Sequence, residues 1–127
     1  MSRWVIHSRG MFEARHALSS YMGKQESPHH HRWEVAIRVG TERLNKEHFA
    51  LDFHAVHQIL SVEVDALDGT PLNDHPEIGA PSPTAERVAE VLAERLAPQY
   101  AALGGTLLTV SVWEGPDNRV DLNFEQS

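Results

Sequence analysis

The chain has 127 residues and a net charge of −7 at pH 7 with histidines counted as neutral, a length that suits one domain. Hydrophobic residues make up 41% and charged residues 23%, so we expect a buried core rather than disorder. The acidity argues against nucleic acid or an anionic membrane surface as a partner, and no apolar run is long enough to span a membrane. There is no cysteine, which excludes disulfides, thiolate metal sites and cysteine nucleophiles. Charge appears too early at the N-terminus for a secretory signal, so we expect a cytoplasmic protein.

Two strands are predicted in the first third of the chain. Residues 3–18 alternate around Gly10, and the alternation places Phe12, Ala14 and His16 on one face. Residues 29–39 alternate more clearly, with His29, His31, Trp33, Val35, Ile37 and Val39 on one face. We expect these two strands to form an antiparallel pair.

Two helices and two further strands are predicted in the rest of the chain. A helical stripe runs through Phe53, Val56, Leu60, Val64 and Leu67. A second helix is expected to begin with Ser82 as its cap and Pro83 in its first turn, to bury Val88, Leu92 and Leu96, and to end before Pro98. Alternation then predicts a strand with Leu108, Val110, Val112 and Glu114 on one face, a turn at 115–118, and a closing strand with Val120, Leu122 and Phe124.

The element order β-β-α-α-β-β predicts a single α+β domain over residues 1–127. An antiparallel sheet carries both helices on one face. The edge strands of such a small sheet are exposed, which favours self-association.

The histidines are the most informative side chains. There are nine of them, and His29, His30 and His31 are consecutive. His29 and His31 project from one face of their strand, and His16 has the same register on the preceding strand, so three imidazoles can converge. Three histidines with one open position are typical of catalytic zinc, although such a pair on a strand can also be hydrogen-bonded without metal. Glu114 points to the same side as the apolar residues, either as an ion-paired structural group or to hold a ligand.

Several motifs resemble the 6-pyruvoyltetrahydropterin synthase and 6-carboxytetrahydropterin synthase family. They are Phe12-Glu13-Ala14-Arg15-His16, His29-His30-His31, Leu51-Asp52-Phe53, Leu67-Asp68, Leu72-Asn73-Asp74, Pro83-Thr84-Ala85-Glu86 and Val112-Trp113-Glu114. The resemblance implies the tunnelling fold, whose units assemble through their sheets into rings, commonly hexamers of two stacked trimers. It also implies that His16, His29 and His31 bind zinc. Glu114 would grip the 2-amino group and N3–H of a pterin, with Thr84 near the same anchor.

The chain departs from this family at three positions. The catalytic cysteine of the synthases, four residues before the first histidine of H-x-H, is replaced by Gln25, which cannot act as a base. Asp68 is kept, but Gly69 replaces the histidine that completes the Cys-Asp-His relay, and His30 replaces a glycine. The chain is therefore predicted to be a variant without the usual catalytic cysteine. His75 could compensate for the missing histidine if its loop folds back.

Glu26 offers another catalytic group. Glu26-Ser27-Pro28-His29-His30-His31 resembles the E-x-x-H-G-H motif of a subgroup that cleaves 7,8-dihydroneopterin triphosphate to 6-hydroxymethyl-7,8-dihydropterin. Glu26 would then take a hydroxyl proton as the C1′–C2′ bond breaks; alternatively, it is a solvated loop carboxylate.

The sequence thus favours a zinc-dependent lyase that acts on the side chain of a reduced pterin, assembled as a homohexamer. A pterin- or purine-binding paralogue that keeps zinc but has lost catalysis is the main alternative. A metal-free structural protein that uses the fold to oligomerise is the third hypothesis.

Overall fold

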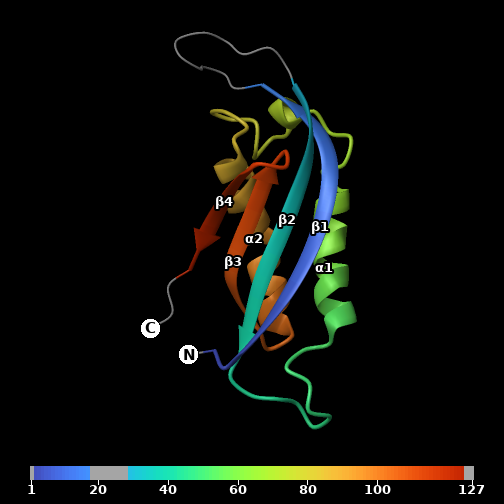
Figure 1. The fold of residues 1–127 in the computed structure, drawn as a ribbon, viewed down its shortest axis with the longest axis vertical. Coiled ribbons are helices and arrows are strands. Elements are labelled where there is room, and N and C mark those ends of the chain that lie inside the picture. The colour runs from blue at the N-terminus through green and yellow to red at the C-terminus, as the bar shows by residue number, and fades with distance from the viewer. Residues whose placement is uncertain (1, 18–28, 125–127) are drawn as a thin grey trace.

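The structure, a computed structural model, describes residues 2–17 and 29–124. Its elements are β1 (Trp4–His16), β2 (His29–Thr41), α1 (Phe53–Asp65), a 3-10 turn η1 (Leu72–Asp74), α2 (Ala85–Ala102), β3 (Thr106–Glu114) and β4 (Asn118–Asn123). This order confirms the predicted β-β-α-α-β-β arrangement (Figure 1). Among the described residues, no helix is both long and apolar enough to cross a membrane.

The four strands form one antiparallel sheet in the order β1-β2-β3-β4. Ala14 pairs with His31 and, on the same strands, His16 pairs with His29, which confirms the predicted hairpin. Trp33 of β2 pairs with Glu114 at the end of β3. The register therefore brings the ends of β1 and β3 to opposite sides of the first residues of β2.

Both helices pack on the same face of the sheet, as predicted (Figure 1). Strand alternation directs apolar side chains from β1, β2 and β3 toward them, and burying this layer stabilises the fold. The largest of these side chains are Phe12 and Trp33, whose stacked rings lie 5.7 Å apart between centroids. Val56, Leu60 and Val64 from α1, and Val88, Leu92 and Leu96 from α2, complete the core.

The helix boundaries correct three expectations. Phe53 is 73% exposed, because it is the first residue of α1 and the buried stripe begins one turn later at Val56. Thr84, and not Ser82, caps α2 through its side-chain oxygen, which accepts a hydrogen bond from the backbone N–H of Arg87.

Pro98 does not end α2, which continues to Ala102. A proline inside a helix removes one backbone hydrogen bond and costs roughly 3 kcal/mol. The side chain of Tyr100, buried two residues later, anchors the last turn, and its hydroxyl donates to the carbonyl of Val56 at 3.0 Å. Packing of this last turn offsets the cost of the proline.

Candidate metal and ligand site

Three side chains from three strands meet at one end of the sheet, the upper end in Figure 1. His16 is the last residue of β1, His31 lies near the start of β2, and Glu114 is the last residue of β3. One ligand atom from each of them lies within 4.8 Å of the other two. On the side of His16 the cluster is shielded from solvent, because that side chain is only 2% exposed.

The orientation of His16 is fixed by a contact with the start of α2. Its Nδ1 lies 2.9 Å from the carbonyl oxygen of Pro83, which can only accept, so Nδ1 carries the proton. In the neutral imidazole Nε2 then has a lone pair, the arrangement in which a histidine binds a metal through Nε2.

The electrostatics of the cluster call for a cation. Nε2 of His16 lies 2.7 Å from Oε1 of Glu114, and Nε2 of His31 lies 3.3 Å from the same oxygen. A lone pair and a carboxylate oxygen repel each other at 2.7 Å unless a proton or a metal ion is shared between them. Two imidazoles and a carboxylate are also donors that zinc accepts, so the residues present fit a metal ion.

Aromatic packing holds the two imidazoles. The ring of His16 lies edge-on to Trp33 and to His31, with centroid separations of 4.9 Å and 5.0 Å. Trp33 is fully buried, and its indole N–H donates to the carbonyl of Ala14. A rigid wall of this kind preserves ligand geometry before any ion binds.

The third predicted zinc ligand is placed only by its backbone. His29 pairs with His16 in the register of β1 and β2, and its side chain lies outside the described residues. The backbone thus brings all three predicted zinc ligands to one end of the hairpin. Gln25 and Glu26 lie outside the described residues altogether.

A hollow of about 450 Å³ borders Glu114. Its walls come from the first turn of α2 and from the β3–β4 hairpin: Ala85, Glu86, Glu114, Asp117, Asn118, Arg119 and Val120. Several carboxylates line it, so it suits a ligand rich in N–H donors. Thr84 precedes this wall directly, and its oxygen is already engaged as the cap of α2.

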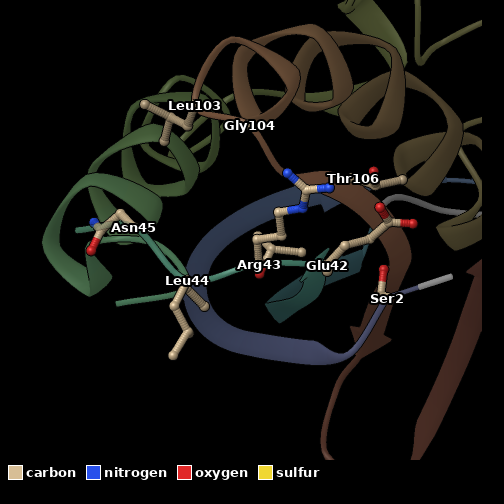
Figure 2. Close-up of a pocket in the computed structure, with 11 residues that line it drawn as sticks. Ser2, Glu42, Arg43, Leu44, Asn45, Leu103, Gly104 and Thr106 are labelled. Atoms are coloured by element: carbon tan, nitrogen blue, oxygen red, sulfur yellow. The ribbon is translucent and has the colours of Figure 1, made fainter. Parts of the chain in front are cut away.

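The hollow of about 480 Å³ at the other end of the sheet is separate from this cluster. Figure 2 shows its polar side chains, among them Glu42, Arg43 and Thr106. None of His16, His31 or Glu114 lines it. Although this hollow is large, it is not the site indicated by the sequence motifs.

Asp68 lies along the free edge of β1. Its Oδ1 accepts a hydrogen bond from the backbone N–H of Glu13 at 2.9 Å, and the next N–H, that of Gly69, donates to the Glu13 carbonyl. Within the described part of the chain, no hydrogen bond or ion pair joins Asp68 to the three clustered side chains. Within one protomer, the Asp68 carboxylate thus holds residues 68–69 against the edge of β1.

His75 likewise stabilises its own loop. Its Nδ1 accepts hydrogen bonds from the backbone N–H groups of Glu77 and Ile78, both at 3.1 Å. It lines a small crevice between α1 and α2 with Leu67 and Arg95. Nδ1 is therefore occupied by these two backbone donors.

Some contacts around this cluster carry no signal in the sequence. The Pro83 carbonyl that orients His16 is a backbone atom 67 residues away, and residue type does not reveal it. Arg119, in the hollow beside Glu114, lies on a short strand whose alternation alone gave no reason to select it. The edge-on packing of Trp33 against His16 could have been anticipated, because both lie on the inward face of a predicted hairpin.

Comparison with known proteins agrees with these motifs. The family model described as 6-pyruvoyl tetrahydropterin synthase matches residues 5–125. The 6-carboxy-5,6,7,8-tetrahydropterin synthase of Synechocystis sp. is 31% identical over 98 residues, which cover 73% of this chain and 74% of that protein.

Solved structures of low sequence identity share the fold. The 6-pyruvoyl tetrahydropterin synthase of Caenorhabditis elegans superposes with a TM-score of 0.78 at 18% identity, over 96% of each chain. A 6-pyruvoyltetrahydropterin synthase of Plasmodium vivax, in a form with a catalytic glutamate replaced by alanine, gives a TM-score of 0.68 at 14% identity over 95% of this chain and 99% of that one.

Proposed function

The chain belongs to the 6-pyruvoyl tetrahydropterin synthase family, and from that premise we propose that it is a zinc-dependent lyase acting on the side chain of a reduced pterin. The observation that carries the proposal is the cluster of His16, His31 and Glu114. Its two imidazole nitrogens face one carboxylate oxygen, an arrangement that a bound cation stabilises.

His16, His29 and His31 are the proposed zinc ligands. His16 contributes Nε2, since Pro83 holds the proton on Nδ1. Bound zinc would act as a Lewis acid toward an oxygen of the substrate side chain. Glu114 remains beside these histidines as the group that binds the heterocycle.

Glu114 and the hollow next to it form the proposed pterin subsite. A carboxylate can accept two parallel N–H groups from the guanidine-like edge of a pterin, and such charged, bidentate hydrogen bonds are strong and directional. Thr84 directly precedes Ala85, which lines the hollow. Its oxygen accepts from the backbone N–H of Arg87, which leaves its O–H free to donate to a ligand.

Glu26 is the proposed general base. It takes the proton of a side-chain hydroxyl while the C1′–C2′ bond breaks in a retro-aldol sense, and the carbon left on the pterin is then protonated. The chain has no cysteine that could do this work. A catalytic glutamate in the Plasmodium vivax enzyme of the same fold supports a carboxylate in this role.

We assign Asp68 and His75 to a shared site in a homohexameric ring of two stacked trimers. Among the described residues, neither of them forms a hydrogen bond or ion pair with His16, His31 or Glu114, so we propose that each acts on a neighbour's substrate. The two edge strands support ring assembly: β1 exposes Trp4, Val5 and Met11, and Phe124 is 40% exposed just after β4.

The second candidate is a binding protein that keeps the metal and the pterin subsite without catalysis. Gln25 and Gly69, in place of two proton carriers of the synthases, favour it. It predicts ligand binding with no product.

The deciding experiment incubates the zinc-loaded protein with 7,8-dihydroneopterin triphosphate and resolves the pterin products by chromatography and mass. We expect 6-hydroxymethyl-7,8-dihydropterin from the parent, and a rate at least about 100-fold lower from Glu26→Gln. Glu90→Gln, an exposed change of the same kind on α2, is the matched control. An unchanged rate in Glu26→Gln contradicts the proposed base, and binding without turnover in the parent favours the second candidate.

A further inference from the structure

The face of the sheet that the helices leave uncovered carries a second hollow, of about 380 Å³. All four strands contribute to it, and its lining residues alternate with the core residues of the same strands. It is lined by His7, Arg9, Ala36, Arg38, Thr109, Ser111, Trp113, Arg119, Asp121 and Asn123.

The strand register explains why this face is hollow. Ala36 and Ser111 pair directly on β2 and β3, so two short side chains form the floor. The next rows on either side contain long side chains: Trp113 paired with Arg119, and Arg38 paired with His7. A shallow basin results, enclosed by guanidinium and aromatic groups.

Two of the arginines are held in place around Trp113. The guanidinium carbons of Arg9 and Arg119 lie 5.1 Å and 5.3 Å from the indole centroid, within the range of cation–π attraction. Arg9 also pairs with Glu34 at 2.6 Å, and Arg119 pairs with Asp121 at 3.1 Å. Exposed pairs of this kind add little stability, but they restrict where each guanidinium can lie.

Arg38 differs from these two. Its Nη1 donates to the hydroxyl of Thr109 at 3.2 Å, and no carboxylate pairs with it in the described part of the chain. The lining of the basin thus holds three guanidinium groups against one carboxylate, that of Asp121, in a chain whose net charge is −7.

We propose that this basin binds a small multivalent oxyanion of the phosphate class, free or as the phosphate end of an organic molecule. Guanidinium groups donate paired N–H bonds that match phosphate oxygens, and Arg38 supplies the unneutralised charge. This site goes beyond the proposed lyase function, because its floor faces away from His16, His31 and Glu114.

Arg119 also lines the hollow beside Glu114, so it is unsuitable for a specific test. Arg38 lines only the basin among the hollows described here. Arg43, exposed at the far end of the sheet, has the same charge and is the matched control.

The test is calorimetric titration of the full-length protein with inorganic pyrophosphate and, in parallel, with a nucleoside diphosphate, at physiological ionic strength where diffuse attraction is screened. We expect saturable binding of at least one of them, weakened about tenfold or more by Arg38→Gln, which removes a charge-assisted hydrogen bond. Arg43→Gln should leave the affinity unchanged. Arg9→Gln should weaken it as Arg38→Gln does.

Three outcomes would overturn the proposal. If neither probe binds saturably, the basin is not an oxyanion site. Equal losses of affinity in Arg38→Gln and Arg43→Gln would mean that binding depends on the overall charge of the protein and not on this basin. Binding that is lost in His31→Ala but kept in Arg38→Gln places the anion at the histidine cluster instead.

Discussion

Nε2 of His16 lies 2.7 Å from Oε1 of Glu114, although 98 positions separate the two residues in the chain. β2 separates their strands, and its His31 contacts the same carboxylate oxygen. With one proton of His16 held on Nδ1 by Pro83, the short contact at Nε2 is stabilised by a second proton or by a metal ion. Two of the proposed zinc ligands therefore lie directly beside the carboxylate that we propose as the pterin anchor.

Replacing His31 should remove zinc. His31→Ala eliminates one proposed ligand on a half-exposed position, so the fold should survive while zinc affinity falls by at least about 100-fold. Metal content is measured after dialysis against a weak chelator, with about one zinc per chain expected in the parent. His54→Ala, an exposed histidine on α1, is the control. Equal zinc content in His31→Ala and the parent would exclude His31 as a ligand.

Replacing Glu114 should separate pterin binding from metal binding. Glu114→Gln keeps the shape of the side chain but loses the charge, and we expect pterin affinity to fall about 10-fold to 100-fold. Zinc content should stay near that of the parent. Fluorescence titration with a reduced pterin and metal analysis on the same sample provide both readouts. Loss of zinc together with the pterin would instead identify Glu114 as a metal ligand.

Thr84→Ala should destabilise the protein. The Thr84 oxygen caps α2 at the Arg87 N–H, and loss of such a cap costs about 1 kcal/mol. The free energy of unfolding is obtained from urea titrations at a fixed protein concentration. Thr84→Ser retains the hydroxyl and should recover most of the loss. A Thr84→Ser variant as unstable as Thr84→Ala would mean that the methyl group, and not the cap, stabilises this position.

Tyr100 should make the fold sensitive to strongly alkaline pH. Burial raises the pKa of Tyr100 above its ordinary value of about 10. Above pH 10 the unfolded state loses the phenolic proton while the folded state keeps it, so this contribution to stability is complete below pH 10 and declines as the pH rises further. The decline is about 1.4 kcal/mol per pH unit.

Urea midpoints at pH 9 and pH 11 measure this effect. Tyr100→Phe should be less stable than the parent at pH 9 by about 1 kcal/mol, because the hydrogen bond to Val56 is lost. Its midpoint should change less between the two pH values. An equal change in both proteins would show that other groups cause the alkaline sensitivity.

The sequence by itself determined the sheet and the layer of helices on it. Alternation in β1, β2 and β3 is a local property, so it predicted which residues face inward, including Phe12, Trp33 and Val112. The same alternation placed His16 and His31 on one face, and the hairpin register confirmed it. The pterin synthase family was also apparent in the sequence, because its motifs occur in order along the chain.

Only the tertiary structure decided the contacts that join distant segments. The Pro83 carbonyl accepts a hydrogen bond from His16, and the backbone N–H of Glu13 donates to the Asp68 carboxylate. Nδ1 of His75 accepts hydrogen bonds within its own loop. None of these contacts follows from residue spacing. The cap at Thr84 and the continuation of α2 past Pro98 also depend on packing between elements. Periodicity reports the direction of a side chain within its own element, whereas a contact depends on how separate elements come together in three dimensions.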